Sequence, residues 1–215
     1  MFQNRAEAAQ RLAERLASYR GQRPLVLAIP RGAVPMGQAI AKALDGDLDV
    51  VLVRKLPAPF DPEIAIGSID ESGATYLDPD ARGFYDEAYL GRERERQLAL
   101  LHERRRVYTG AAEPLDPAGR VVIVVDDGIA TGSTMIAALR AVRTRQPVML
   151  VAAAAVSSWE ALRRVKPNAD DVVCVETPDE LGAVGVHFRD FPEVSDEEVV
   201  DLLRRVHRST SVELM

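Results

Sequence analysis

The sequence VVIVVDDGIATGSTM, residues 121–135, combines a strand, a tight loop and the start of a helix. Its apolar run has no polar alternation, which predicts a strand buried on both faces, as in a parallel sheet covered by helices. Two acids, Asp126 and Asp127, follow the strand, and a loop of small and hydroxyl-bearing residues follows the acids. Such sheets bind ligands beyond the carboxyl ends of their strands, so the acids and the loop form the candidate site.

The loop suits an anionic group, and a phosphate fits best. The first turn of the next helix offers unpaired backbone N–H groups, and Gly132 allows a ligand to approach the backbone closely. Asp126 and Asp127 would repel a bare phosphate but can accept hydrogen bonds from vicinal hydroxyls or lie beside a divalent cation. We therefore expect a sugar phosphate across the loop. An ordinary strand-to-helix turn, capped by Asp, explains neither the paired acids nor the hydroxyls around Gly132.

Two other phosphate-binding motifs do not fit this segment. No Gly-Lys-Ser/Thr follows the strand, as a Walker-type P-loop requires, and no dinucleotide GxGxxG is present there. A glycosidase-type acid and base pair is also disfavoured, because adjacent strand residues point in opposite directions.

Length, composition and charge limit which classes of protein the chain can belong to. With 215 residues and 47% hydrophobic content, the chain suits one domain, residues 1–215. The net charge of -6 gives no general attraction to nucleic acid or anionic membranes. The single cysteine, Cys174, excludes an intrachain disulfide, and no apolar stretch reaches about eighteen residues, the length of a membrane span. Acids interrupt the first helical stretch, so it does not resemble a targeting signal, and we expect a soluble cytoplasmic protein.

Strands and helices alternate along the chain, which predicts an α/β fold with a doubly wound, mostly parallel central sheet and flanking helices. Besides the motif strand, which starts near residue 120, strands are expected at residues 25–30, 49–56, 148–156 and 171–177. Helices are expected at residues 5–19, before 44, at 87–108, from the motif loop to 143, at 157–165 and at 195–207. The Pro- and Gly-rich residues 57–83 include the β-like pieces IAIGSI and ATYL, and their composition suits a mobile flap outside the core.

The segment DDGIATGST, residues 126–134, resembles the phosphoribosyl-pyrophosphate (PRPP) motif of the type I phosphoribosyltransferases. The motif is long and specific. The patterns IPRGAVP and VRKL extend the resemblance over nearly the whole chain, toward stand-alone bacterial proteins assigned to this family by sequence alone. The resemblance implies a core at about residues 22–177, a flexible flap at about 57–83 and a small hood at about 178–215, to which residues 1–20 could contribute.

The resemblance also assigns roles to residues of the motif. In this family the two acids hold the ribose hydroxyls, which gives that role to Asp126 and Asp127. The loop that wraps the 5-phosphate would comprise Gly128, Ala130, Thr131, Gly132, Ser133 and Thr134. One position departs from the purine-salvage members, which have an aspartate that contacts the base where this chain has Ala130.

A second anion site is expected at the ends of earlier strands. The segment PRGAVP, residues 30–35, places an arginine and a glycine just before a helix, where backbone N–H groups and a guanidinium can converge on one anion. By resemblance this is the pyrophosphate loop, which in the family often holds a cis peptide. The pyrophosphate-binding residues would be Pro30, Arg31, Gly32, Ala33, Arg54 and Lys55. Arg54 and Lys55 would otherwise be exposed where the second strand meets solvent, and alternation sends them to opposite faces.

The implied function is transfer of the 5-phosphoribosyl group from PRPP to a nitrogenous base or related acceptor, with release of pyrophosphate. Asp126, Asp127, Lys55 and Arg31 would be the catalytic residues. Mg²⁺ would bind with PRPP, mainly through the ligand's own oxygens, with Asp126 or Asp127 as the protein's contribution. The acceptor is not specified by the sequence, and homodimers are common in the family.

Two alternatives remain open. A non-catalytic PRPP-sensing or nucleotide-sensing domain would keep the same motif. RNA-binding regulators with this motif also exist, and the segments RERERQ and ERRR are rich in arginine. Interleaved glutamates favour a solvated helix with intrahelical ion pairs there, and the overall acidity disfavours a nucleic-acid partner.

Overall fold

A five-stranded parallel sheet forms the centre of the computed structural model, which describes residues 1–110 and 112–212. Its strands run in the order β2 (Asp47–Val50), β1 (Leu25–Ala28), β6 (Val121–Ile129), β7 (Met149–Ser157) and β8 (Asp171–Glu176). All four neighbouring pairs are parallel. The predicted doubly wound α/β sheet is therefore confirmed. Residues 213–215, the end of the predicted hood, lie outside the described residues.

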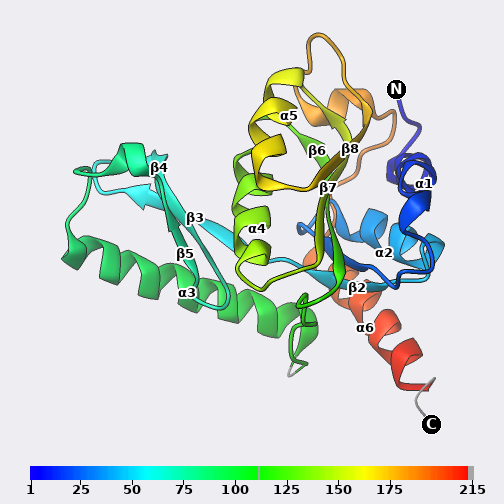
Figure 1. Ribbon diagram of the computed structural model, residues 1–215, viewed down its shortest axis with the longest axis horizontal. Coiled ribbons are helices and arrows are strands. Elements are labelled where there is room, and N and C mark those ends of the chain that lie inside the picture. The colour runs from blue at the N-terminus through cyan, green and yellow to red at the C-terminus, as the bar shows by residue number, and fades with distance from the viewer. Residues whose placement is uncertain (111, 213–215) are drawn as a thin grey trace.

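Helices cover both faces of this sheet, as Figure 1 shows. On one side lie α1 (Arg5–Arg15) and α2 (Val34–Ala43), and on the other α4 (Ser133–Arg143) and α5 (Trp159–Val165). Alternate residues of β1 enter different clusters, Val26 on the side of α1 and α2, and Leu27 on the side of α4. Burial on both faces explains why β1 and the first half of β6 are apolar throughout.

The predicted strand at residues 49–56 is wrong in its extent, because the chain forms two strands there. The parallel strand β2 ends at Val50, and β3 (Val53–Ala58) pairs antiparallel with β4 (Asp61–Asp70). β5 (Thr75–Leu77) completes this smaller sheet. Residues 50–53, which span the break, are all apolar, and an apolar pattern does not show where a strand changes partners.

Most of residues 57–83 belongs to this antiparallel sheet, followed by the short helix η2 (Pro79–Ala81). The pieces IAIGSI and ATYL lie in β4 and around β5, as predicted. The expectation that this region stays outside the core is wrong, because Ile66 is fully buried and Ile69 is 2% exposed. Their apolar side chains join the core cluster of the main sheet, so the segment is packed.

The long helix α3 (Glu87–Thr109) packs against β3 and β4 and lies with them to one side of the main sheet (Figure 1). Asp86 caps its first turn by accepting a hydrogen bond from the N–H of Tyr89 at 2.6 Å. None of the described helices is long and apolar enough to cross a membrane.

The N-terminus lies beside the tail segment, the residues that follow β8 and precede the last helix. The N–H of Phe2 donates to the carbonyl of His187 at 2.8 Å, and the N–H of Arg189 donates to the carbonyl of Phe2 at 2.9 Å. This tail segment contains the short helix η4 (Val184–His187); the other short helices are η1 (Ala17–Tyr19) and η3 (Lys166–Asn168).

The last helix, α6 (Asp196–Val212), packs against α2 and α3, away from η4. Its predicted start is confirmed, since the N–H of Glu198 donates to Oγ of Ser195 at 3.1 Å. The predicted hood therefore consists of two separate parts, the segment around η4 with the N-terminus, and α6.

Candidate functional site

The candidate site lies where β1 ends beside the middle of β6, which continues through Asp126 and Asp127 to Ile129. The chain leaves β1 toward α2 on one face and leaves β6 toward α4 on the other, so this is the switch point of the sheet, where such folds bind ligands. The N–H of Ile29 donates to the carbonyl of Val125 at 2.9 Å. This pairing places the predicted pyrophosphate loop next to the two acids of the motif.

Gly32 has no room for a side chain. A Cβ atom at this position would lie 2.2 Å from Oδ2 of Asp127, closer than any real contact allows. The loop that contains Gly32 therefore approaches the carboxylate with its backbone. The peptide bond between Pro30 and Arg31 is cis, a feature that the family resemblance left open for this chain.

Asp127 is paired with an arginine that the sequence did not point to. Nε and Nη2 of Arg5 donate to Oδ2 of Asp127 at 3.1 and 3.0 Å, and the two side chains are 12% and 16% exposed. Burial raises the pKa of Asp127, and the contact with Arg5 opposes this shift. Arg5 thus stabilises a negative charge next to the loop.

Asp126 lies in a different environment from its neighbour. Burial raises its pKa well above the usual range, and the adjacent charge of Asp127 raises it further. The N–H of Asp127 donates to Oδ1 of Asp126 at 2.9 Å and partly offsets this effect. Two carboxylates next to each other, with only one paired to a cation, can accept hydrogen bonds from hydroxyl groups of a ligand.

An aromatic stack connects Arg5 to the N-terminus. The guanidinium carbon of Arg5 lies 3.7 Å from the ring centroid of Phe191, which stacks on Phe188 at 4.6 Å; Phe188 in turn lies 5.2 Å from Phe2. One face of Phe191 is therefore covered by Arg5 and the other by Phe188. These contacts leave less of either ring available for stacking on a planar base.

A cavity of about 410 Å³ opens between this stack and the strand ends. Its lining includes Arg31, Gly32 and Asp127 from the strand ends, and Val184 and Phe191 from the tail. Residues predicted to bind pyrophosphate and ribose thus border one cavity with the tail segment. Its size is within the range of small-molecule sites, about 300–1,000 Å³.

Arg31 points from its loop toward the tail, where it forms an ion pair with Glu193. Its side chain is 36% exposed and that of Glu193 is 80% exposed. An ion pair this open to solvent contributes little to stability, so Arg31 can exchange Glu193 for an anionic ligand at low cost.

The predicted 5-phosphate loop is open to solvent. Ala130, Thr131, Ser133 and Thr134 are exposed, and Oγ1 of Thr131 lies 3.2 Å from Oγ of Ser133. Gly132 has a φ of 83°, a left-handed conformation that favours glycine, and it directly precedes α4.

Helix α5 supports this loop from the side. Nη1 of Arg164 donates to the carbonyl of Thr131 at 2.9 Å, and Oγ of Ser158 lies 3.4 Å from the carbonyl oxygen of Ala130. The next residue, Trp159, is 60% exposed. The loop is therefore held through its carbonyls. The N–H of Ser133 makes only a long contact of 3.4 Å with Oγ1 of Thr131, which an anion at the start of α4 can replace.

The segment around η4, part of the predicted hood, contacts the motif directly at Gly128. A Cβ atom there would lie 2.4 Å from Cγ1 of Val184 in η4. The hood segment around η4 thus rests on the backbone of β6, immediately after the two acids.

Arg54 and Lys55 lie in β3 and point in opposite directions, as the alternation predicted. Nε of Arg54 donates to Oε1 of Gln97 in α3, which directs Arg54 away from α4. In the strand register, Lys55 lies opposite Ser68 of β4, and Ser68 lies opposite Tyr76 of β5. Tyr76 contacts Arg140, so this face of the antiparallel sheet is the one toward α4. In the described residues, no hydrogen bond or ion pair connects either cation to Arg31 or to the motif acids.

Among the described residues, no group of three or more His, Cys, Asp or Glu side chains could hold a metal ion. His102 lies 2.9 Å from the carbonyl of Glu71, and His187 lies 2.8 Å from the carbonyl of Leu181. Cys174 is partly buried, and burial raises the pKa of its thiol, which disfavours a reactive thiolate.

The sequence model of the phosphoribosyl transferase domain matches residues 2–189. Two Mycobacterium tuberculosis proteins, from strains CDC 1551 and H37Rv, carry the provisional name phosphoribosyl transferase and are 40% identical to this chain over 210 residues. The match covers 97% of this chain and 47% of each relative, so the chain spans about half the length of the curated relatives it matches. A crystal structure of TT1426 from Thermus thermophilus is 42% identical, with a TM-score of 0.85 over 95% of this chain and 98% of that one.

Proposed function

The chain belongs to the phosphoribosyl transferase domain family, and we propose that it transfers the 5-phosphoribosyl group of PRPP to a nitrogenous acceptor and releases pyrophosphate. The observation that carries this proposal is that β1 ends beside the acids of β6. It places the backbone at Gly32 against Asp127 and opens both toward one cavity.

In this proposal PRPP lies across the switch point. Asp126 and Asp127 accept hydrogen bonds from the ribose hydroxyls, and the 5-phosphate binds the hydroxyls and first N–H groups of residues 131–134. Arg31 leaves Glu193 and binds the pyrophosphate together with backbone donors of its loop. Lys55 would reach this pyrophosphate only if its side chain left the face toward α4.

The reaction breaks the bond between the anomeric carbon and a pyrophosphate oxygen, and the acceptor nitrogen then forms a bond to that carbon. Positive charge develops on the ribose in the transition state, as in glycoside hydrolysis. The neighbouring carboxylates stabilise this charge, and Arg31 stabilises the negative charge on the departing pyrophosphate.

The carboxylates fit a divalent cation bound mainly by the substrate. Asp126 and Asp127 offer hard oxygen ligands at the correct edge of the sheet, and no other acid, histidine or cysteine completes a metal cluster among the residues the structure describes. When bound with PRPP, Mg²⁺ would supply charge neutralisation to the pyrophosphate.

The test is pyrophosphate release from PRPP with Mg²⁺ over a panel of purine and pyrimidine bases, combined with calorimetry of PRPP binding. We expect Asp126→Asn with Asp127→Asn to weaken PRPP binding at least tenfold, about 1.4 kcal/mol. Arg31→Ala should weaken pyrophosphate binding and leave ribose 5-phosphate unaffected. Unchanged PRPP affinity in the double variant would reject the ribose role.

A second candidate is a domain that binds PRPP or a nucleotide without turnover. It is favoured by Ala130, which removes the acid of the purine-salvage enzymes, and by the covered faces of Phe188 and Phe191. Tight PRPP binding with no pyrophosphate release for any base would support this candidate over the enzyme.

Cytoplasmic location and a homodimer are further parts of this proposal, drawn from composition and from the family. Sedimentation at several protein concentrations tests the dimer. A monomer at all concentrations would reject it.

A further inference from the structure

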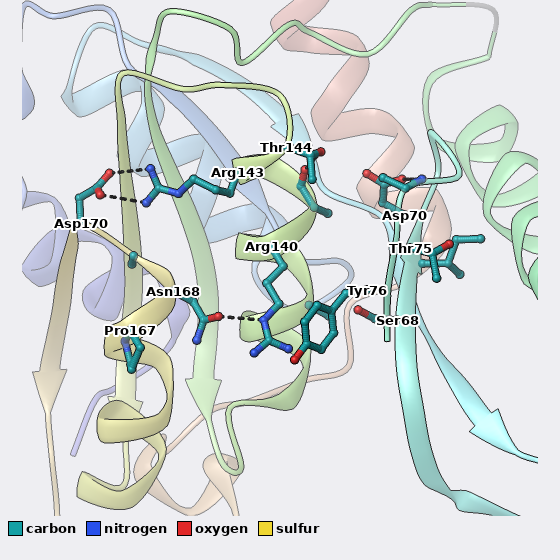
Figure 2. Close-up of a pocket in the computed structure, with 15 residues that line it drawn as sticks. Ser68, Asp70, Thr75, Tyr76, Arg140, Arg143, Thr144, Pro167, Asn168 and Asp170 are labelled. Atoms are coloured by element: carbon teal, nitrogen blue, oxygen red, sulfur yellow. Dashed lines mark hydrogen bonds and ion pairs between the residues drawn. The ribbon is translucent and has the colours of Figure 1, made fainter. Parts of the chain in front are cut away.

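A second cavity lies between α4, the antiparallel sheet and η3, separate from the site at the strand ends (Figure 2). Its volume is about 400 Å³, similar to the cavity at the switch point. Arg140 of α4 lies between Tyr76 on one side and Asn168 on the other (Figure 2). None of the roles proposed above uses Tyr76, Arg140 or Asn168.

Arg140 is held in a fixed orientation. Its guanidinium carbon lies 3.5 Å from the ring centroid of Tyr76, and its Nε donates to Oδ1 of Asn168 at 2.8 Å. In the described part of the chain, its terminal nitrogens have no hydrogen bond or ion pair. A guanidinium fixed by stacking, with its terminal N–H groups free, is ready to bind an oxyanion through two parallel hydrogen bonds.

The acids that line the cavity are already engaged. Oδ1 of Asp70 accepts hydrogen bonds from Ser72 and Ala74 of its own turn. Asp170 forms an ion pair with Arg143 at 2.9 Å and accepts a further hydrogen bond from the N–H of Leu150. Arg140 is therefore the lining cation that lacks a carboxylate partner among the described residues.

Ser68 supplies a second unused donor. It is only 9% exposed, yet its hydroxyl has no hydrogen-bond partner among the residues that the structure describes. A buried hydroxyl without a partner is unfavourable, so its presence is readily explained if a ligand binds there. Figure 2 shows Ser68 on the strand that faces Tyr76 and Arg140. Lys55 lies directly opposite Ser68 across the strands, so its exposed side chain leaves the sheet on the same face and adds positive charge nearby.

We propose that this cavity binds a small organic anion, whose phosphate or carboxylate group is held by the terminal nitrogens of Arg140 and the hydroxyl of Ser68. Tyr76 and Asn168 position Arg140 for this contact. The ligand would connect α4, which carries the 5-phosphate loop at its N-terminal end, to the antiparallel sheet. The cavity would therefore serve as an effector site, and anion binding there does not depend on whether the chain carries out the proposed transfer reaction.

The test is a titration of the isotope-labelled protein with inorganic phosphate and with succinate, followed by NMR of assigned backbone amides. Signals of Ser68, Tyr76 and Arg140 report on this cavity, and those of residues 131–134 report on the 5-phosphate loop. We expect saturable shifts at the first group with either anion. Shifts confined to residues 131–134 would overturn the effector site and leave the proposed function untouched, and no shift at Ser68, Tyr76 and Arg140 would also overturn it.

Arg140→Gln should weaken anion binding at this cavity at least tenfold. Arg143→Gln is the matched control, because Arg143 lies on the same helix and is already paired with Asp170, and it should change the affinity less than twofold. Equal losses in both variants would mean nonspecific charge attraction and overturn the site. Ser68→Ala should weaken binding without lowering Tm, since it removes a buried hydroxyl that has no partner among the described residues. A lower Tm with unchanged binding would overturn the role of Ser68.

Discussion

At the scale of single residues, Asp126 and Gly32 each have a constrained environment at the strand ends. Asp126 is held in an environment that raises its pKa, so its charge is unfavourable in the folded protein. Gly32 has a related constraint, since any side chain there would collide with Asp127. A ligand at the strand ends explains why an unfavourable charge is kept at Asp126, whereas the close approach to Asp127 by itself explains Gly32.

The first prediction concerns stability and pH. Because the pKa of Asp126 is raised in the folded protein, its contribution to the free energy of unfolding is fully present below the pKa of the unfolded state. This contribution is lost as the pH rises through the pKa of the folded state. Asp126→Asn keeps the acceptor for the N–H of Asp127 and removes this penalty. We expect it to raise the free energy of unfolding at pH 7 by about 1 kcal/mol, or about 2–4 °C in Tm, with no gain at strongly acidic pH.

Asp170→Asn is the matched control, for which the expected change in the free energy of unfolding at neutral pH has the opposite sign. The pKa of Asp170 is lowered, mainly by its hydrogen bond to Arg143, so its stabilisation is present at neutral pH and lost on acidification. Because this pair is exposed, the expected loss at pH 7 is below about 1 kcal/mol. Thermal unfolding between acidic and neutral pH measures both variants, and a loss of stability in Asp126→Asn at pH 7 would contradict the argument.

The second prediction concerns Arg5, whose contact opposes the raised pKa of Asp127. Without this cation the pKa of Asp127 rises further, so PRPP binding that needs the carboxylate should require a higher pH. We expect Arg5→Ala to raise the pH at which PRPP binding is half-maximal, and Arg5→Lys to restore part of this shift. Arg11→Ala, which removes an arginine of the same helix that pairs with Glu176, should leave the midpoint unchanged. An unshifted midpoint in Arg5→Ala would rule out this role for Arg5.

At the scale of elements, the contact between η4 and β6 controls how the hood sits over the site. A methyl group at Gly128 would overlap Val184, so either the hood or the strand must move. We expect Gly128→Ala to cost about 1–3 kcal/mol of folding stability through overpacking. Val184→Ala in the same chain should recover most of this loss.

A double-mutant cycle of these two substitutions, measured by denaturant unfolding, gives the coupling energy between hood and strand. Strictly additive effects would mean that η4 does not rest on Gly128 in solution.

Elements with a strong local signal could be predicted from the sequence, and those defined by distant partners could not. The acids of the motif follow a fully apolar strand, and the fold then determines that β1 ends beside them. The break at Val50 is different, because the residues on both sides are apolar and only the pairing changes.

The same limit applies to Arg5. It begins an ordinary amphipathic helix after the cap residue Asn4, and nothing local marks it as a partner of Asp127. Its role depends on the N-terminal segment pairing with the tail, a contact between opposite ends of the chain. The sequence does not assign a role to Phe188 and Phe191 for a similar reason, since stacking on a ligand and packing in the core both need aromatic rings.

At the scale of the whole molecule, one arginine connects the antiparallel sheet and α3 to the main sheet. Arg105 of α3 is 9% exposed and donates to Asp49 of β2 at 2.7 Å and to the carbonyl of Val50 at 2.9 Å. It also binds Glu71, which follows β4, through Nε at 2.6 Å. Three elements therefore meet at one buried guanidinium.

The last prediction follows from this junction. Arg105→Ala leaves Asp49 and Glu71 without their cation, which should cost about 3–5 kcal/mol and lower Tm strongly. Arg104→Ala is the control, because Arg104 is 45% exposed and its ion pair with Asp196 should contribute less than about 1 kcal/mol. Thermal unfolding and limited proteolysis of residues 53–77 measure the effect. Similar small losses in both variants would show that the junction is not important for stability.

The position of Trp159 allows its intrinsic fluorescence to report on ligand binding. It is the single tryptophan of the sequence, it is largely exposed, and it directly follows the serine that approaches the carbonyl of Ala130. A ligand that orders the 5-phosphate loop will change the solvent around this indole and hence the wavelength and intensity of its emission. Occupancy of the loop can therefore be followed by fluorescence in the unlabelled protein, in real time.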